Sequence, residues 1–352
     1  MTPAGGSSRS LAGRFLKNLL AVLLSVLVAL VIGEILVRII YGNRLPLAPR
    51  YVTGRQYNDF KIRGNVPNAK YRHRTSEGSW DFRINGQGFR DTRDFAYAKP
   101  EGVLRVLVLG DSFTAGYEVH QHQSYAAVLE RYLDGHGVET EVLNAGVSGS
   151  GNAEELVYLE QEGIKYRPDV VVVGFFRNDL TDNIRANLYA VENGALTLKS
   201  KEYLPAVGVR DCLNSFWPYR YLSEHSYLHG LVNQRATILV RQMVLDRNLK
   251  GLGKEGVDAA PDESSVAGYQ EDLAVALLNR MAEVAHTNGA YLIVLDIPRK
   301  TLVPSFPAPE RLDFVPQKGA YLDASAWLKP YEGLADLYRA AGGGHWTEFG
   351  HT

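Results

Sequence analysis

Four short apolar runs constrain the fold of this chain more than any other feature of its sequence. They read LRVLVLG, ETEVLN, DVVVVGFF and AYLIVLDI, at residues 104–110, 139–144, 169–176 and 290–297. Runs of this length suit strands that are buried on both faces of a parallel sheet. Helix-compatible segments lie between them, at residues 124–133, 153–165 and 269–286. This alternation predicts an α/β fold in which helices cover both faces of a parallel sheet.

A longer apolar segment near the N-terminus predicts a single transmembrane helix over residues 18–41. Residues 18–33 read NLLAVLLSVLVALVIG without a charge, and the apolar character continues past Glu34 and Arg38. A hydrocarbon core of about 30 Å needs about 20 helical residues. The two charges would then lie near the far interface, where their i, i+4 spacing lets them pair. A cleaved signal peptide is the alternative, but the run is long and no A-x-A site follows, which favours an uncleaved signal anchor.

The flanking residues suggest how the rest of the chain is divided. Three basic residues within 1–17 predict a cytoplasmic tail and a domain in the periplasm or outside the cell. Arg38 near the far end of the span, with Arg44 and Arg50 beyond it, weakens this asymmetry. Residues 42–100 are expected to form a β-rich lead-in, with a strand at 79–85 before a glycine-rich turn. Residues 101–352 would form the α/β domain, with an insertion at about 181–265.

Composition and charge exclude several functional classes. The chain is 45% hydrophobic and 22% charged, which excludes collagen, coiled-coil and wholly disordered chains. The net charge of −1 provides no overall field for nucleic acid. The single cysteine, Cys212, cannot form an internal disulfide or a cysteine-rich metal site, and His120 and His122 lack a further ligand at metal-site spacing. We therefore expect no metal, no cofactor and no nucleic-acid partner.

The loops that follow three of the apolar runs carry residues that fit one reaction. Open parallel sheets bind ligands at the carboxyl ends of their strands. Ser112, two residues after the first run, is either a nucleophile or a helix N-cap. Gly149 and Asn178 follow the second and third runs, and they offer a backbone N–H and a side-chain amide, the two kinds of donor found in oxyanion holes. His345, near the end of the chain, would remove the proton from Ser112.

These four blocks, in this order, resemble the SGNH or GDSL hydrolase family. The GDS motif is at 110–112, and Gly149, Asn178 and His345 match the family's second, third and fifth blocks. NGQGFR at 85–90, ahead of RVLVLGDSFTAGYEV, is similar to membrane-anchored, exported bacterial members. The resemblance implies a flavodoxin-like, three-layer α/β/α sandwich. It also implies ester hydrolysis through an acyl-enzyme on Ser112, with His345 as base and an oxyanion hole formed by the N–H groups of Ser112 and Gly149 and by the Asn178 amide.

Two positions depart from the family pattern. Phe176 stands where the third block has a glycine, and we expect it to line the pocket beside Asn178. Gly342 stands three residues before His345, where the family has its acid, so the expected triad carboxylate is missing. A backbone carbonyl could orient the histidine instead. Three acidic residues without motif support are possible substitutes: Asp323, Asp336 and Glu348.

The expected substrate, by family analogy and presumed location, is a small acyl ester on a cell-envelope glycan. Lipid esters, O-acyl transfer to a glycan hydroxyl and a non-catalytic envelope binding or assembly role remain open, as do the oligomeric state and a truncation after Thr352, where the family continues into a closing helix. Four aromatic residues within the insertion either line an acyl or sugar site or pack in the core: Trp217, Tyr219, Tyr221 and Tyr227.

Overall fold

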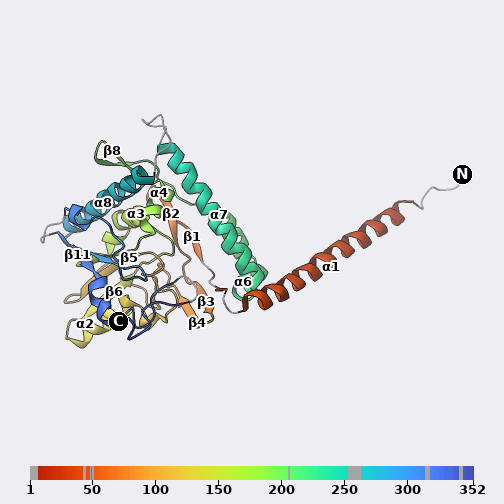
Figure 1. Cartoon of the computed structure of the whole chain (residues 1–352), viewed down its shortest axis with the longest axis horizontal. Coiled ribbons are helices and arrows are strands. Elements are labelled where there is room, and N and C mark those ends of the chain that lie inside the picture. The colour runs from red at the N-terminus through yellow and green to blue at the C-terminus, as the bar shows by residue number, and fades with distance from the viewer. Residues whose placement is uncertain are drawn as a thin grey trace.

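The computed structural model describes residues 7–42, 45–47, 49, 51–204, 207–252, 263–313, 318–340 and 344–352 (Figure 1). Gly342, the position at which the family acid is expected, lies outside the described residues. The described chain consists of one long N-terminal helix and a globular body, from which that helix projects.

The body is built around a five-stranded parallel sheet in the order β11-β10-β7-β5-β6. The strands are β5 (Leu104–Gly110), β6 (Thr140–Asn144), β7 (Val170–Phe175), β10 (Tyr291–Asp296) and β11 (Gly319–Asp323). The first four are the predicted apolar runs, whereas β11, which is short and only partly buried, was not predicted. In chain order the strands lie 2-1-3-4-5, which is the flavodoxin-like arrangement with a switch point between β5 and β7.

Helices cover both faces of this sheet. α3 (Asn152–Gln161), α4 (Asp179–Ala186) and α8 (Glu263–Thr287) lie on one face, and α2 (Tyr125–Gly135) and α9 (Ala324–Leu328) on the other. Alternate residues of β5 face opposite layers: Leu107 and Leu109 pack in the cluster with α3, α4 and α8, whereas Val106 and Val108 pack with α2. The predicted three-layer α/β sandwich is therefore confirmed.

The lead-in consists of two antiparallel hairpins that pack against the α/β domain. They are β1 (Val52–Tyr57) with β2 (Phe60–Asn65), and β3 (Lys70–Thr75) with β4 (Gly78–Arg83), which contains most of the expected strand at 79–85. Tyr71 and Phe82 form a buried cluster with Tyr117 of the domain. Arg90, just after the hairpins, donates hydrogen bonds to the carbonyls of three residues in the turn that follows β5: Ala115, Gly116 and Val119.

Between α4 and α8 the chain forms a small hairpin and three helices. These are β8 (Tyr189–Glu192), β9 (Ala195–Leu198), α5 (Val207–Ser215), α6 (Trp217–His225) and α7 (Tyr227–Leu252). α7 runs along one edge of the body (Figure 1). Near its end Asn248 donates to the carbonyl oxygens of Ile184 and Arg185 in α4, at 2.9 and 3.2 Å. Short 3₁₀ turns occupy Gln121–Gln123, Gly163–Tyr166, Pro309–Arg311 and Lys329–Tyr331.

The N-terminal helix α1 (Ser7–Tyr41) extends away from the body (Figure 1). Among the described residues, its Gly13–Tyr41 stretch is the one helix long and apolar enough to cross a membrane, a test that a signal sequence also passes. Glu34 Oε1 and Arg38 Nε pair at 2.7 Å, as their spacing predicts. Glu34 also accepts hydrogen bonds from the backbone N–H groups of Tyr227 and Leu228, at 3.1 and 2.9 Å, and so joins α1 to the first turn of α7.

Candidate active site

Ser112 and His345, far apart in the sequence, are in direct contact. The Nε2 atom of His345 lies 2.8 Å from the Oγ atom of Ser112. Ser112 belongs to a series of turns after β5, in which its carbonyl oxygen accepts a hydrogen bond from the N–H of Tyr117 at 3.0 Å. The N-cap of α2 is Ser124, so Ser112 does not have the helix-capping role that was the alternative. The contact is the geometry of a hydroxyl nucleophile and its general base.

The imidazole of His345 is fixed by the residues that follow Ser112. Its ring lies 5.0 Å from that of Phe113 and 5.6 Å from that of Tyr117, measured between centroids. Its carbonyl oxygen accepts a hydrogen bond from the N–H of Arg339 at 2.8 Å. The residue is buried, with 8% of its surface exposed. The ring is therefore held in one place by aromatic packing and by the backbone.

His351, the other histidine near the end of the chain, has a different role. Its Nδ1 atom accepts a hydrogen bond from the N–H of Tyr125 at 3.2 Å. Burial, with smaller contributions from Arg90, His345 and Arg339, lowers the pKa of His351 to about 3. The ring is therefore neutral at physiological pH, and it supports the start of α2 rather than the nucleophile.

Gly149 lies in the loop after β6, where only glycine fits easily. Its φ angle is 76°, and a Cβ atom there would collide with the guanidinium of Arg241. The Nη2 atom of Arg63 donates to the carbonyl oxygen of Gly149 at 2.6 Å, which fixes that peptide. Within the described part of the chain, no residue accepts a hydrogen bond from the N–H of Ser112 or of Gly149. Both donors expected in the oxyanion hole are thus available.

Asn178, at the end of β7, is held by two carboxylates. Its Nδ2 atom donates to Oδ2 of Asp111 at 3.0 Å and to Oδ2 of Asp182 at 2.9 Å. Asp111 also accepts from the N–H of Phe113 at 2.8 Å, so it ties Asn178 to the turn that carries Ser112. Both amide hydrogens of Asn178 are engaged in these bonds. An oxyanion would therefore have to replace one of the carboxylates as acceptor.

Buried carboxyl groups lie under this edge of the sheet. Four of them are less than one-tenth exposed: Asp111, Glu155, Asp179 and Asp182. Burial raises the pKa of Glu155 to about 8, although hydrogen bonds from Asn152 and Ser150 oppose the shift. Burial and the neighbouring carboxylates of Glu155 and Asp111 raise the pKa of Asp179 well above its ordinary value. Within the described residues, no group of three or more His, Cys, Asp or Glu is placed to hold a metal ion.

The other ring nitrogen of His345 faces a carboxylate that the sequence analysis did not consider. Oε2 of Glu118 lies 3.6 Å from Nδ1 of His345, and the Glu118 side chain is only 4% exposed. Glu118 follows Ser112 by six residues, and its φ angle of 64° is unusual for a residue with a side chain. An acidic residue inside the turn that carries the nucleophile was the signal available in the sequence.

None of the three acidic residues considered as substitutes has a described contact with His345. Asp323 caps α9 by accepting a hydrogen bond from the N–H of Ser325 at 2.8 Å. Glu348 pairs with Arg339. Asp336 contributes its backbone carbonyl oxygen to the hydroxyl of Thr347. These positions therefore give no support to a role in the triad.

Two sets of aromatic residues near the site can now be placed. The ring of Phe176 packs on that of Phe113 with centroids 4.4 Å apart, beside the His345 ring, so it forms part of the aromatic wall there. In the insertion, Trp217 and Tyr221 are 69% and 58% exposed, so core packing does not account for them. Tyr219 instead lines a pocket.

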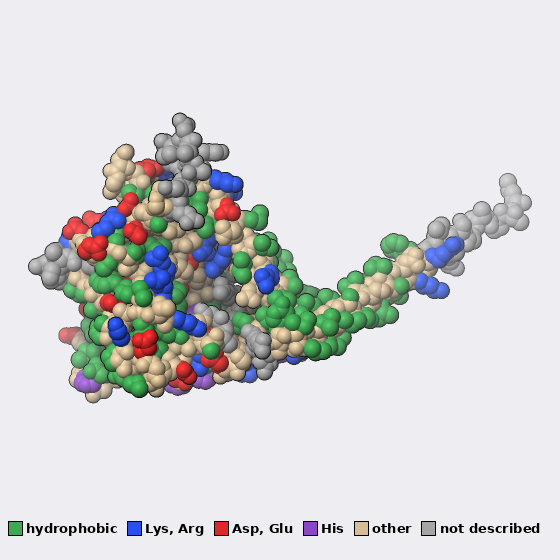
Figure 2. All heavy atoms as spheres, in the orientation of Figure 1, with side chains coloured by type: hydrophobic (Ala, Val, Ile, Leu, Met, Phe, Trp, Pro, Cys, Tyr) green, Lys and Arg blue, Asp and Glu red, His purple; other side chains and the backbone are tan. Residues whose placement is uncertain are grey.

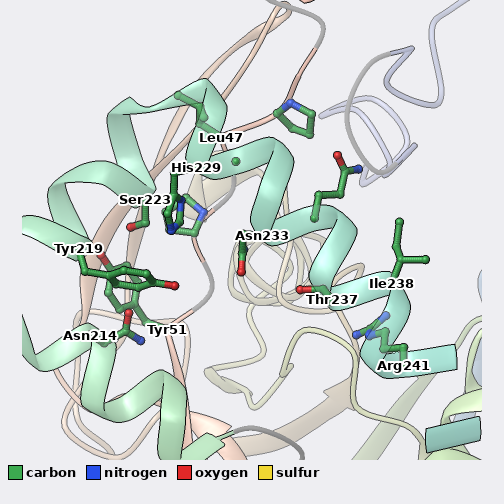
Figure 3. Close-up of a pocket in the computed structure, with 14 residues that line it drawn as sticks. Leu47, Tyr51, Asn214, Tyr219, Ser223, His229, Asn233, Thr237, Ile238 and Arg241 are labelled. Atoms are coloured by element: carbon green, nitrogen blue, oxygen red, sulfur yellow. The ribbon is translucent and has the colours of Figure 1, made fainter. Parts of the chain in front are cut away.

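That pocket lies between the lead-in and α5–α7 (Figure 3). Figure 3 shows Asn233, Thr237 and Arg241 along α7. Tyr51 and Tyr219 lie at the end of the pocket away from Arg241. A neighbouring pocket shares four lining residues with the first: Tyr219, Asn233, Thr237 and Arg241. It is also lined by Arg63 and by Ser148, the residue before Gly149. A hollow with both polar and apolar walls therefore extends from α6 to the Gly149 loop.

Comparison with known proteins assigns the chain to a family. Residues 108–352 match the GDSL-like lipase/acylhydrolase family. A 75-residue stretch is 35% identical to an arylesterase of Vibrio mimicus and covers 21% of this chain and 38% of that enzyme. Among solved structures, TesA is similar to this chain with 17% sequence identity and a TM-score of 0.36. The alignment covers 70% of this chain and 91% of the TesA chain.

Two further solved structures share the resemblance. The SGNH-hydrolase family esterase AlinE4 has 16% sequence identity to this chain and a TM-score of 0.35. The alignment covers 70% of this chain and 87% of the AlinE4 chain. A two-domain esterase active on acetylated mannans has 18% identity and a TM-score of 0.21, over 46% of this chain and 52% of its own. The family match runs from within β5 to Thr352 and includes all four predicted blocks. The predicted resemblance is confirmed, and the chain belongs to the GDSL-like lipase/acylhydrolase family.

Proposed function

We propose that this protein is a serine ester hydrolase with Ser112 as nucleophile and His345 as general base. The observation that carries the proposal is the 2.8 Å contact between Oγ of Ser112 and Nε2 of His345. As Ser112 attacks the ester carbonyl, its proton moves to Nε2, and the N–H groups of Ser112 and Gly149, with the Asn178 amide, bind the oxyanion. The alcohol leaves with that proton, and a water activated by the same ring releases the acid.

The substrate that we propose is a small acyl ester, such as an acetyl group, on a cell-envelope glycan. The pocket between the lead-in and α5–α7 supports this because amide and hydroxyl groups contribute to its lining, among them Asn214, Ser223 and Asn233. Such groups hydrogen-bond sugar hydroxyls, and the ring of Tyr219 offers a face on which a sugar can pack.

We place the esterase domain outside the cytoplasm, tethered by α1, with residues 1–17 on the cytoplasmic side. The apolar side chains of α1 are largely exposed, which suits contact with lipid (Figure 2). The contacts of Glu34 with Tyr227 and Leu228 favour an anchor that is retained, because removal of a signal peptide that includes Glu34 would leave the first turn of α7 without this acceptor.

Hydrolysis of p-nitrophenyl acetate by the full chain in detergent tests the proposed reaction. We expect Ser112→Ala and His345→Ala each to lower kcat by about 10³-fold or more. Ser76→Ala and His136→Ala, at exposed positions, serve as matched controls and should retain the wild-type rate. A fluorophosphonate probe should label the wild type and not Ser112→Ala. Equal hydrolysis by all five proteins would contradict the proposal and favour a binding role.

Release of acetate from O-acetylated oligosaccharides tests the proposed substrate class. We expect kcat/KM for acetylated oligosaccharides to exceed that for p-nitrophenyl octanoate. The reverse order would favour a lipid ester. Transfer of the acetyl group to an added oligosaccharide, in place of its release into water, would identify an acyltransferase.

A further inference from the structure

We propose that Glu118 is the residue that orients His345, in the place of the family's acid three residues before the histidine. This inference rests on the proposed esterase function. Glu118 and Ser112 lie at the two ring nitrogens of His345: Oε2 of Glu118 is 3.6 Å from Nδ1, and Oγ of Ser112 is 2.8 Å from Nε2. A hydroxyl, an imidazole and a carboxylate in this order form a catalytic triad.

The surroundings of the ring favour this pairing. His345 is 8% and Glu118 3% exposed, so water competes little for either group. Nδ1 of His345 is buried and makes no hydrogen bond to any described residue. The separation of 3.6 Å is longer than a hydrogen bond, and a small rotation of the Glu118 side chain shortens it. Catalytic hydrogen bonds are often long before substrate binds.

The turn that carries Glu118 is braced from the lead-in. The guanidinium of buried Arg90 donates to the carbonyl oxygens of Ala115, Gly116 and Val119, the last at 2.7 Å. This bracing holds Glu118 in its left-handed conformation, which side chains normally disfavour. Arg90 ends the NGQGFR segment, so that segment supports the residue that faces the histidine.

The proposed role of Glu118 is to stabilise charge without taking up a proton. When the proton of Ser112 moves to Nε2 of His345, the ring becomes an imidazolium that still holds its Nδ1 proton. The carboxylate of Glu118 accepts a hydrogen bond from Nδ1–H, selects that tautomer and balances the positive charge. Glu118 stays ionised throughout, and the proton passes from Nε2 to the leaving alcohol. Glu118 is thus a positioning residue that acts through His345.

Kinetics of Glu118→Gln in the full chain test this role. We expect kcat to fall by about 10³–10⁴-fold, as when a triad carboxylate is replaced by its amide, while KM changes less than about threefold. Glu118→Asp should recover part of kcat, because aspartate keeps the charge and tolerates the left-handed backbone. Glu348→Gln is the matched control and should retain the wild-type rate. A folded Glu118→Gln with kcat within threefold of wild type would overturn the inference.

A second measurement does not depend on activity. In protein with ¹⁵N-labelled histidine, the Nδ1–H proton of His345 should give a strongly deshielded resonance, identified by its loss in His345→Ala. We expect Glu118→Gln to shift this resonance markedly toward the normal range and Glu348→Gln to leave it unchanged. A resonance unaffected by Glu118→Gln would overturn the pairing even if the protein proved not to be an esterase. Loss of esterase activity in Ser112→Ala tests the proposed function separately.

A different observation concerns the outer face of the insertion. From it we infer that α6 and α7 lie on the lipid surface from which α1 emerges, an inference that rests on the proposed anchor. On α7 one side presents apolar residues at spacings of four, three and four: Val232, Ala236, Leu239 and Met243. Leu239 and Met243 are 64% and 70% exposed, as is Trp217 of α6 at 69%. In Figure 2 hydrophobic side chains border this edge and continue onto α1.

The joint between α1 and α7 identifies lipid as the partner of this face. Arg38 Nη2 donates to the carbonyl oxygen of His225 at 2.9 Å, and Glu34 accepts from the first turn of α7. A helix rises about 1.5 Å per residue, so the stretch from Arg14 to Glu34 spans about 30 Å, the thickness of a hydrocarbon core. The joint therefore falls at the membrane interface, where an apolar helix face with aromatic residues is stabilised.

Quenching of site-specific labels by brominated lipids tests this placement. In full-length Cys212→Ser protein in vesicles, single cysteines are introduced by Met243→Cys, Leu24→Cys and Tyr132→Cys and carry an environment-sensitive dye. We expect strong quenching at position 24, clear quenching at 243 and little at 132, which is exposed on α2. Equal, weak quenching at 243 and 132 with strong quenching at 24 would overturn the surface contact alone. Weak quenching at all three would overturn the anchor as well.

Discussion

At the scale of single residues, the buried carboxyl groups under the site determine how the protein responds to pH. Glu155, buried below the Gly149 loop, has its pKa raised to about 8 by burial. The folded protein then keeps this proton up to about pH 8, whereas an unfolded chain releases it above about pH 4.5. Between these values the folded state binds more protons, so the free energy of unfolding falls as the pH rises.

Replacement of Glu155 by glutamine should remove much of this dependence. A neutral amide keeps the shape of the side chain and carries no charge to desolvate, so Glu155→Gln should be more stable than wild type at pH 8 and closer to it at pH 5. Urea unfolding midpoints at the two pH values measure the effect. The exposed Glu139→Gln is the control and should follow the wild type. An equal loss of stability between pH 5 and 8 in Glu155→Gln and wild type would contradict this account.

At the scale of elements, the hairpin β3–β4 and the segment after it act as part of the α/β domain. Phe82 of β4 lies under the guanidinium of Arg90, 3.9 Å from it to the ring centroid. Burial lowers the pKa of Arg90 to about 10, which reflects the cost of keeping this charge away from water. The three carbonyl acceptors in the turn after β5 compensate for that cost, and in return the turn is fixed.

Arg90→Met should therefore affect both stability and activity. Loss of the guanidinium leaves buried carbonyl groups without their donor, and we expect the free energy of unfolding to fall by about 3 kcal/mol. We also expect kcat to fall, because the turn no longer fixes Glu118. Arg83→Met, at an exposed position of β4, should change stability by less than about 0.5 kcal/mol. Urea unfolding and ester hydrolysis measure the two effects, and a stable, fully active Arg90→Met would contradict the bracing role.

At the scale of the whole molecule, α7 connects the apolar helix to the active-site edge. Its first turn is bonded to Glu34 of α1, and near its end Asn248 is bonded to α4, the helix that begins directly after Asn178. Between these ends α7 lines the polar pocket with residues such as Asn233 and Arg241. The insertion therefore reaches from the proposed membrane anchor to α4 (Figure 1).

The sequence alone determined the features that depend on local pattern. Four of the five sheet strands, the apolar helix and the positions of Ser112, Gly149 and Asn178 after strands followed from short runs of residues. A strand that is buried on both faces, and a helix that faces lipid, both need apolar side chains at consecutive positions. Such elements can therefore be predicted from short stretches of sequence. The partnership of Ser112 with His345 was predicted from the chemistry of the two side chains and from the family resemblance, because no local pattern joins residues so far apart.

Only the tertiary structure decided which distant groups meet. It brought Glu118 to the Nδ1 side of the His345 ring and joined Asn178 to Asp111 and Asp182. It also packed the lead-in against the turn that carries Ser112. Strand β11 also depended on context, because a short, only partly buried run forms a strand here by pairing with the edge of β10. These contacts depend on how buried surfaces fit together in three dimensions, a property that no single stretch of sequence carries.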